Sequence, residues 1–127
     1  MDSKDVAIQE KTCTRQEAIG YVSMYLLTET GNRRIIWIEK GQRIAAKTMA
    51  TIRESIDSSS IRESNSEKLQ MVNGNALVIV PVPSGSSLRG AQANVVIRGA
   101  DVLLTKNLIQ VVSPLAAVRG TEFFRIQ

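Results

Sequence analysis

The first half of the chain has a hydrophobic pattern that predicts a helix near residues 15–28. Ile19, Val22 and Leu26 follow one another at intervals of three and four, which is typical of one apolar face of an α-helix. The residues Thr14-Arg-Gln-Glu17 fit a capping box at its start, and Gly31 is a natural stop. A short strand over residues 6–11 precedes this helix.

A strand and a second helix follow directly. Residues 34–40 are apolar at both alternating sets of positions, which predicts a strand that is buried on both faces and central in a sheet. Gly41 ends this strand. A helical period then continues from residue 42 to about 56, so the predicted order is strand, helix, strand, helix.

The second half of the chain favours strands. Residues 76–82 form a continuous apolar run, and Pro81 and Pro83 place it at an edge or at a strand end. The polar stretch 58–75 predicts no element. Further strand candidates lie at residues 93–98, 102–104, 108–112 and 123–126, and a turn or hairpin tip lies at residues 84–87.

Size and composition indicate a small globular protein. The chain has 127 residues and a mass of 13.9 kDa, so it has room for one compact domain with an extension. It has no apolar run near the roughly 20 residues of a membrane span, and its first residues do not resemble a signal peptide. Because its single cysteine cannot form an internal disulfide, we expect an intracellular protein, in the cytoplasm or in the nucleus or nucleoid. Because no apolar run is long enough to span a membrane, we expect no membrane contact.

The same composition argues against several kinds of catalytic site. Histidine is absent, and the lone Cys13 cannot make a zinc site, which needs about four N or S ligands. The sequence has no close pair of aspartates that would suggest a magnesium site. Gly85 and Gly90 have the spacing of a phosphate-binding loop, but Ala91 and Gln92 stand where lysine and Ser/Thr are required. We therefore expect a non-enzyme with no cofactor and no metal.

Charge suggests an anionic partner. The net charge is +4, and residues 11–53 alone carry eight basic and three acidic side chains, a balance of +5. Arg43 and Lys47 are four apart and share one face of the second predicted helix, close to Lys40. A helix N-terminus adds free N–H groups that favour phosphate. The alternative is a solvated basic face that only keeps the protein soluble.

The segment around the second strand resembles the Alba family of small basic nucleic-acid-binding proteins. The likeness rests on Tyr21-Val22 and on the run Ile35 to Lys47, in which a hydrophobic strand ends in a basic residue and glycine before a helix. It covers roughly residues 6–56. Gly41 and Ile44 fit the family pattern G-x-x-I-x-x-A, whereas Lys47 stands where alanine is usual.

The resemblance implies an α+β fold, a two-layer β-α-β-α-β-β domain over residues 1–99, with residues 100–127 as an extra C-terminal β-rich extension. It also implies a homo- or heterodimer that binds DNA or RNA through a β-hairpin over residues 83–93 and through basic loops. Carried onto this sequence, the nucleic-acid-binding residues are Lys11, Arg15, Lys40, Gln42, Arg43, Lys47 and Arg89.

Two functional hypotheses follow. The first is a non-enzymatic nucleic-acid-binding protein that neutralises phosphates more than it reads bases. The alternative is a structural or assembly protein that self-associates through its C-terminal strands. The apolar content of residues 76–112 exceeds what two short helices can cover, which favours a dimer or larger assembly in either case.

Overall fold

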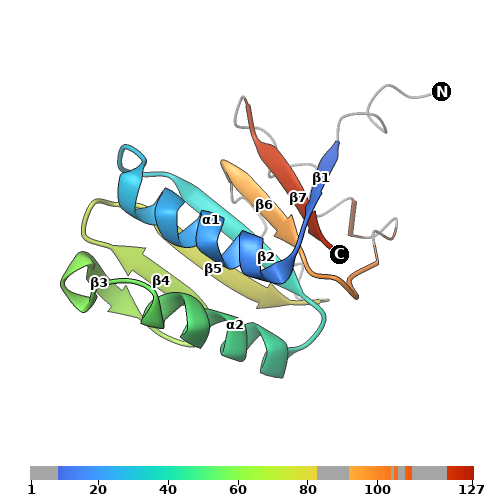
Figure 1. Ribbon diagram of the computed structural model, residues 1–127, viewed down its shortest axis with the longest axis horizontal. Coiled ribbons are helices and arrows are strands. Elements are labelled where there is room, and N and C mark those ends of the chain that lie inside the picture. Colours follow the sequence, from blue (N-terminus) through green and yellow to red (C-terminus); the bar gives the residue numbers. More distant parts are fainter. Residues whose placement is uncertain (1–8, 83–91, 104, 106–107, 110–119) are drawn as a thin grey trace.

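The structure, a computed structural model, describes residues 9–82, 92–103, 105, 108–109 and 120–127 (Figure 1). The elements that can be bounded in the described residues are two α-helices, a 3-10 turn and a seven-stranded sheet, so the expected combination of α and β elements is confirmed. In chain order the elements are β1 (Glu10–Cys13), α1 (Arg15–Thr28), β2 (Arg34–Glu39), α2 (Gln42–Glu54), the 3-10 turn η2 (Ser58–Ser60), β3 (Ile61–Ser64), β4 (Lys68–Met71), β5 (Ala76–Pro81), β6 (Val95–Arg98) and β7 (Glu122–Ile126).

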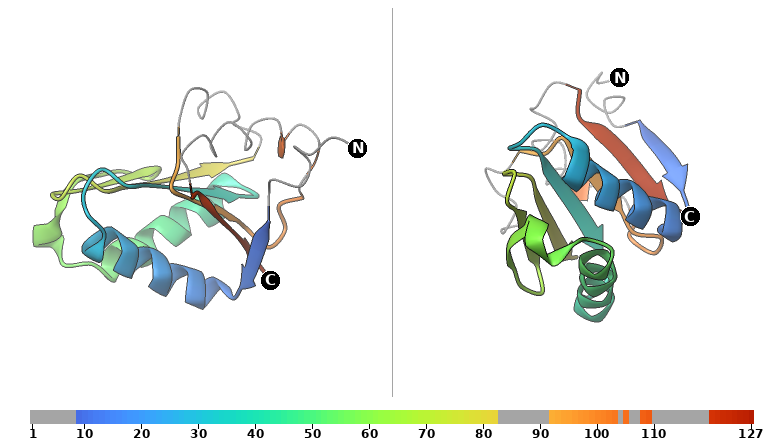
Figure 2. Two further views of the ribbon diagram at one scale, coloured as in Figure 1. Left: turned by 90° about the horizontal axis from the view of Figure 1, so that it is seen from above. Right: turned by 60° about the vertical axis from the view of Figure 1, so that its left-hand side comes forward.

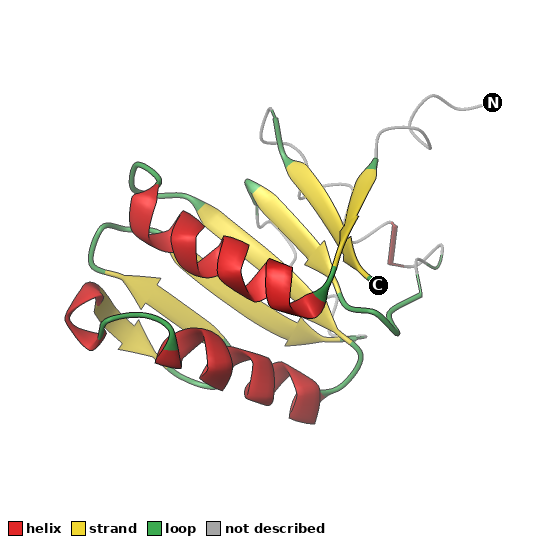
Figure 3. Cartoon of the chain, in the orientation of Figure 1, coloured by secondary structure: helices red, strands yellow, loops and turns green. Residues whose placement is uncertain are grey.

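The sheet, yellow in Figure 3, has the strand order β1-β7-β6-β2-β5-β4-β3, with the strands labelled in Figure 1. Its first five members are parallel, and β4 and β3 continue the sheet as an antiparallel pair. The connections from β1 to β2 and from β2 towards β5 each contain a helix, as crossovers between parallel strands of one sheet usually do. Both helices lie on the same face of the sheet (Figure 2).

Local sequence fixes the start of α1, and side chains distant in sequence hold its end. The predicted capping box is confirmed, since the Glu17 N–H donates to Thr14 Oγ1 at 3.1 Å and the Thr14 N–H donates to the Glu17 carboxylate at 2.8 Å. At the other end, the side-chain amides of Asn73 and Asn75 donate to the Leu26 carbonyl at 2.9 and 3.0 Å. These contacts satisfy backbone groups that the helix leaves free.

Two apolar clusters fill the two faces of the sheet. The larger lies between the sheet and the helices and includes Trp37, Leu26 and Met49, all fully buried. The smaller lies on the opposite face and includes Ile36, Val96 and Phe123. The strand β2 contributes to both clusters, which confirms the predicted central strand with two apolar faces.

The region between α2 and β6 differs from the sequence-based expectation. Residues 58–75 contain η2 and the hairpin of β3 and β4, which the polar character of this stretch did not predict. Of the two alternatives for residues 76–82, the edge position is wrong, because β5 lies between β2 and β4, whereas the strand end is confirmed by Pro81. Pro81 is tolerated there because it is the last residue of the strand, where the ladder ends.

The C-terminal segment is only partly strand. Val102 and Leu103 lie outside any strand, and residues 108–109 are helical, so these described parts of the expected strands 102–104 and 108–112 are not extended. The expected strand at 123–126 is confirmed as β7, and it pairs with both β1 and β6. The division into 1–99 and 100–127 stays a prediction. Neither described helix has the length and apolar character needed to cross a membrane.

Tyr21 connects α1 to β7. Its ring centroid lies 5.0 Å from that of Phe124, and its hydroxyl donates to the Glu122 carboxylate at 3.4 Å. Burial, followed by the negative charge of Glu122, raises the pKa of Tyr21 to about 12. Both causes disfavour the phenolate in the folded state.

This shift predicts a loss of stability at high pH. The folded-state pKa of Tyr21 is higher than the unfolded value near 10, so its stabilising contribution is complete below pH 10 and is lost as the pH rises to about 12. Urea unfolding between pH 9 and pH 12 should show a steeper decline for wild type than for Tyr21→Phe. Identical pH dependence of the two proteins would show that Tyr21 does not titrate in this way.

Candidate functional site

The carboxyl ends of the parallel strands meet at one edge of the sheet, and both helices begin there (Figure 1). In open α/β sheets, ligands bind at this edge. It brings together Arg15 at the start of α1, Glu39 at the end of β2 and Thr48 in α2, residues that are far apart in sequence. This edge is therefore the candidate site.

A buried ion pair forms its centre. Glu39 is only 2% exposed, and the Arg15 guanidinium donates to both of its carboxylate oxygens, at 2.6 and 3.3 Å. The Trp37 indole N–H donates to Glu39 Oε2 at 2.9 Å, and the Thr48 hydroxyl donates to the same oxygen at 3.4 Å. Arg15 also donates to Thr48 Oγ1 at 3.0 Å. The buried carboxylate is thus fully supplied with donors, as a buried charge requires.

Gly99, which follows β6, lies against this carboxylate. A Cβ atom at position 99 would overlap Glu39 Oε1 and would lie 3.3 Å from the Ile38 carbonyl oxygen. The Gly99 N–H donates to that carbonyl at 2.8 Å, which holds the backbone in place. Only glycine fits beside Glu39 in this arrangement.

A second ion pair braces the opposite face of the sheet. Arg98 donates through Nε and Nη2 to the two Glu10 oxygens at 2.9 and 2.6 Å, and both side chains are largely buried. A further bond from Arg98 reaches the Val102 carbonyl. Because β7 lies between β1 and β6, this pair joins two strands that are not neighbours. The charges of Arg98 and Glu10 neutralise each other, and the pair ties β1 to β6 across β7.

The structure separates the sequence-predicted site residues into three groups. Arg15 belongs to the Glu39 ion pair and is only partly exposed. Lys11 pairs with Glu122 at 3.2 Å and lies over the Phe124 ring. Exposed positions at the end of β2 and the start of α2 hold Lys40, Gln42, Arg43 and Lys47. Arg89 and the expected hairpin tip lie outside the described residues.

The basic residues at α2 differ from Arg15 in having no described ion-pair partner. The described carboxylates that form salt bridges are Glu10, Glu39 and Glu122, and none of them contacts this group. The N-cap of α2 is Gly41, which offers no side-chain hydrogen bond, so the first N–H groups of this helix are not capped by a side chain of that residue. The start of α2 is therefore more open to a ligand than the start of α1, which its capping box closes.

Sequence reasoning missed Glu39, Thr48, Glu10 and Arg98. A single acidic residue after an apolar strand was the only local signal for Glu39. Sequence reasoning also missed a near-match to a phosphate-binding loop. This near-match differs from the required pattern only in having Ala46 in place of glycine, in the run Gly41-Gln-Arg-Ile-Ala-Ala46-Lys47-Thr48. The structure shows that this segment is not a loop, because α2 begins at Gln42.

Comparison with known proteins identifies the fold. No family model and no curated protein matches the chain. Among solved structures, the large terminase of a thermophilic bacteriophage matches 95% of this chain with a TM-score of 0.70 and 12% identity. The same terminase in complex with ADP matches 86% with a TM-score of 0.64 and 12% identity. The chain spans about a third of the terminase length, 34% and 29% in the two structures.

These matches overturn the Alba resemblance and what it implied. The fold is that of part of a large terminase, so the Alba family and an Alba-like non-enzymatic binder are wrong, as is the alternative of a self-assembling structural protein. The expectation of a non-enzyme is also contradicted, because a protein with this fold has been solved with ADP. The strand, glycine and helix that carried the resemblance are common to any β-α unit.

The start of α1 does not fit the phosphates of a bound nucleotide. Phosphates are usually held by a glycine-rich loop between strand and helix, whereas Thr14 alone separates β1 from α1. The capping box already bonds N–H groups there, and Arg15 is neutralised by Glu39. We therefore assign no nucleotide step to the start of α1.

Proposed function

We propose that this chain works in phage DNA packaging as a module of the large-terminase type. The observation that carries the proposal is the fold, which agrees with a large terminase over 95% of the chain at a TM-score of 0.70. Large terminases belong to ATP-driven DNA-packaging machinery. We place the chain in the cytoplasm of the infected cell, where such machinery assembles.

Duplex DNA is the partner that best fits the surface at the start of α2. Lys40, Arg43 and Lys47 are exposed there, and no described carboxylate neutralises them. The uncapped N-terminus of α2 adds N–H donors and the positive end of the helix dipole. We infer that this surface contacts DNA phosphates, and that Gln42 beside it provides a further polar contact.

The salt dependence of DNA binding tests this surface. Each neutralised phosphate contributes a slope of about −0.9 in log affinity against log salt for duplex DNA. Changing Lys40, Arg43 and Lys47 together to alanine should therefore flatten the slope by roughly two to three. Fluorescence anisotropy with a labelled duplex at several salt concentrations measures this. The melting temperature should change little, because the three side chains are exposed.

A matched control removes the same charge elsewhere. Arg34, Arg62 and Lys68 lie at the start of β2 and in the β3–β4 hairpin, away from the start of α2. Their joint replacement by alanine should leave the slope unchanged. If both triple variants flatten the slope equally, net charge and not this surface drives binding.

A genetic experiment tests the packaging role itself. A nonsense codon in the gene for this chain, placed in the phage that encodes it, should leave capsids without DNA in electron micrographs of the lysate. Expression of the intact chain in trans should restore filled capsids. Filled capsids in the mutant lysate would overturn the proposed function.

Self-association stays a prediction for this module. Light scattering at tens of micromolar should give a mass about twice 13.9 kDa if the chain forms the expected dimer by itself. A monomer mass would contradict the expected dimer and leave the DNA surface to act within a larger packaging complex.

A further inference from the structure

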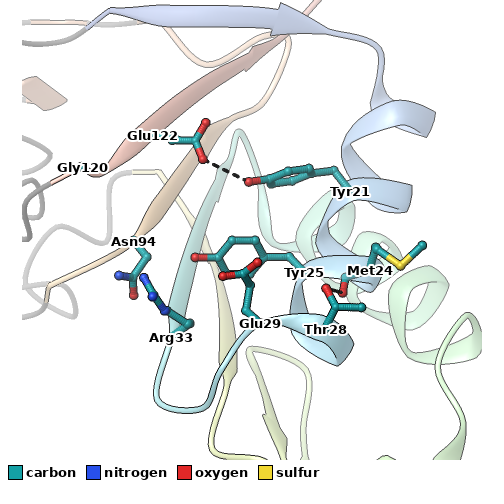
Figure 4. A pocket seen from close by; sticks show the side chains of 9 residues that line it. All are labelled: Tyr21, Met24, Tyr25, Thr28, Glu29, Arg33, Asn94, Gly120 and Glu122. Atoms are coloured by element: carbon teal, nitrogen blue, oxygen red, sulfur yellow. Dashed lines mark hydrogen bonds between the residues drawn. The ribbon is translucent and has the colours of Figure 1, made fainter.

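A hollow lies between α1 and the sheet, at the opposite end of the strands from Glu39. It has a volume of about 380 Å³ and is open to solvent. Figure 4 shows side chains of α1, of the segments that follow it and of the start of β7 pointing into it. The lining residues with aromatic or charged side chains are Tyr21, Tyr25, Glu29, Arg33 and Glu122.

Aromatic rings form one wall of this hollow. The ring centroids of Tyr21 and Tyr25 are 5.7 Å apart and the rings are tilted by 41°. Both side chains are half-buried, so each leaves part of its ring accessible. Met24 of the same helix, which is 62% exposed, extends the wall. Ring faces of this kind attract cations through their negative quadrupole.

Carboxylates outnumber cations around the hollow. Glu29 and Glu122 both line it, against the single Arg33. The Glu122 side chain is 43% exposed. Its carboxylate accepts a hydrogen bond of 3.4 Å from the Tyr21 hydroxyl and forms an ion pair with Lys11, whose side chain is 70% exposed. Both contacts are weak enough to yield to a better-placed cation, because exposed ion pairs contribute little.

We infer that this hollow binds an arginine side chain presented by a partner protein. A guanidinium can lie against a tyrosine ring while its planar fork donates to a carboxylate, which matches the mixed wall of Tyr21, Tyr25 and Glu122. Lysine lacks the fork and the flat face. Two carboxylates would repel a DNA phosphate, so this site is separate from the basic surface at α2. The inference does not depend on the proposed function.

The raised pKa of Tyr21 is consistent with this electrostatic picture. After burial, the largest contribution comes from the negative charge of Glu122, and Glu29 adds to it. For Tyr25, the nearby Arg33 acts in the opposite direction and lowers the pKa, although burial still raises it. The negative side of the hollow is therefore the part next to Tyr21 and Glu122, which is where the guanidinium is expected.

The experiment uses the full chain and three small probes. N-acetyl-argininamide, N-acetyl-lysinamide and N-acetyl-citrullinamide differ in charge and planarity at the tip of the side chain. Titration followed by NMR should shift the ring signals of Tyr21 and Tyr25 with the arginine probe at millimolar concentrations. The lysine probe should bind several-fold more weakly, and the uncharged citrulline probe should give no saturable shift.

Variants locate the site. Glu122→Gln should weaken binding of the arginine probe about tenfold, the effect of one charge-assisted hydrogen bond. Glu54→Gln, at an exposed position of α2, should leave it unchanged. Equal shifts with the citrulline probe, no shift with any probe, or equal weakening by both variants would each overturn the inference. Because no DNA is present, these outcomes are independent of the packaging experiment.

Discussion

Replacing Arg15 with methionine is expected to lower the free energy of unfolding by about 3 kcal/mol. The change removes the cation that donates to both oxygens of Glu39 and leaves a carboxylate that is 2% exposed with only Trp37 and Thr48 as donors. An unpaired buried charge costs far more than a lost surface contact. Urea unfolding followed by circular dichroism at pH 7 measures the loss.

The partner variant separates this cause from a general loss of packing. Glu39→Gln removes the buried charge and leaves the Arg15 side chain, which is 37% exposed and can be hydrated, so its cost should be only about 1 kcal/mol. The double variant should be more stable than Arg15→Met alone. Lys11→Met, which breaks the exposed pair with Glu122, should cost less than about 1 kcal/mol and is the control. Equal losses for the two single variants would contradict the interpretation.

Local signals were sufficient for the elements between Thr14 and Glu54. The capping box fixes the start of α1, the two-faced apolar run fixes β2 as a central strand, and Gly41 separates β2 from α2. Each of these depends on residues that are close in sequence. The β3–β4 hairpin was missed because each strand has only four residues, too few for a clear alternation of apolar and polar positions. The turn between β4 and β5 contains Gly74, which has a positive φ of 97°.

The sheet order could not be deduced from local patterns. Its decisive feature is that β7, the last strand, lies between β1 and β6, which places the end of the chain beside its beginning. A pairing between strands so distant in sequence leaves no trace in the apolar period of either strand. A short resemblance over residues 6–56 therefore suggested the wrong family, because it covered a β-α-β-α unit that several folds share.

The candidate site was invisible for the same reason. Arg15 was predicted as a nucleic-acid contact from the Alba resemblance, but its partner Glu39 is 24 residues away, and the two meet only because α1 and β2 share one edge of the sheet. Trp37 is buried in the core, yet its indole N–H is also a donor to that carboxylate. Such multiple use of a residue becomes apparent only when the strands are placed side by side.

The Arg15–Glu39 pair also depends on a glycine, and Gly99→Ala is expected to lower the free energy of unfolding by about 2–4 kcal/mol. The added Cβ would overlap Glu39 Oε1, an oxygen whose carboxylate is held by Arg15, Trp37 and Thr48, so it cannot move without breaking those bonds. The backbone is fixed as well, by the bond from the Gly99 N–H to Ile38. Urea unfolding of the variant measures the cost.

A second glycine supplies the matched control for this last prediction. Gly20 is exposed within α1 and has no atom within 4 Å of an added Cβ, so Gly20→Ala should stabilise the chain by about 0.5–1 kcal/mol through helix propensity alone. Combining Gly99→Ala with Glu39→Ala, which removes the clashing carboxylate, should cost less than the sum of the two single changes. Strict additivity would show that Gly99 acts through its own backbone and not through Glu39.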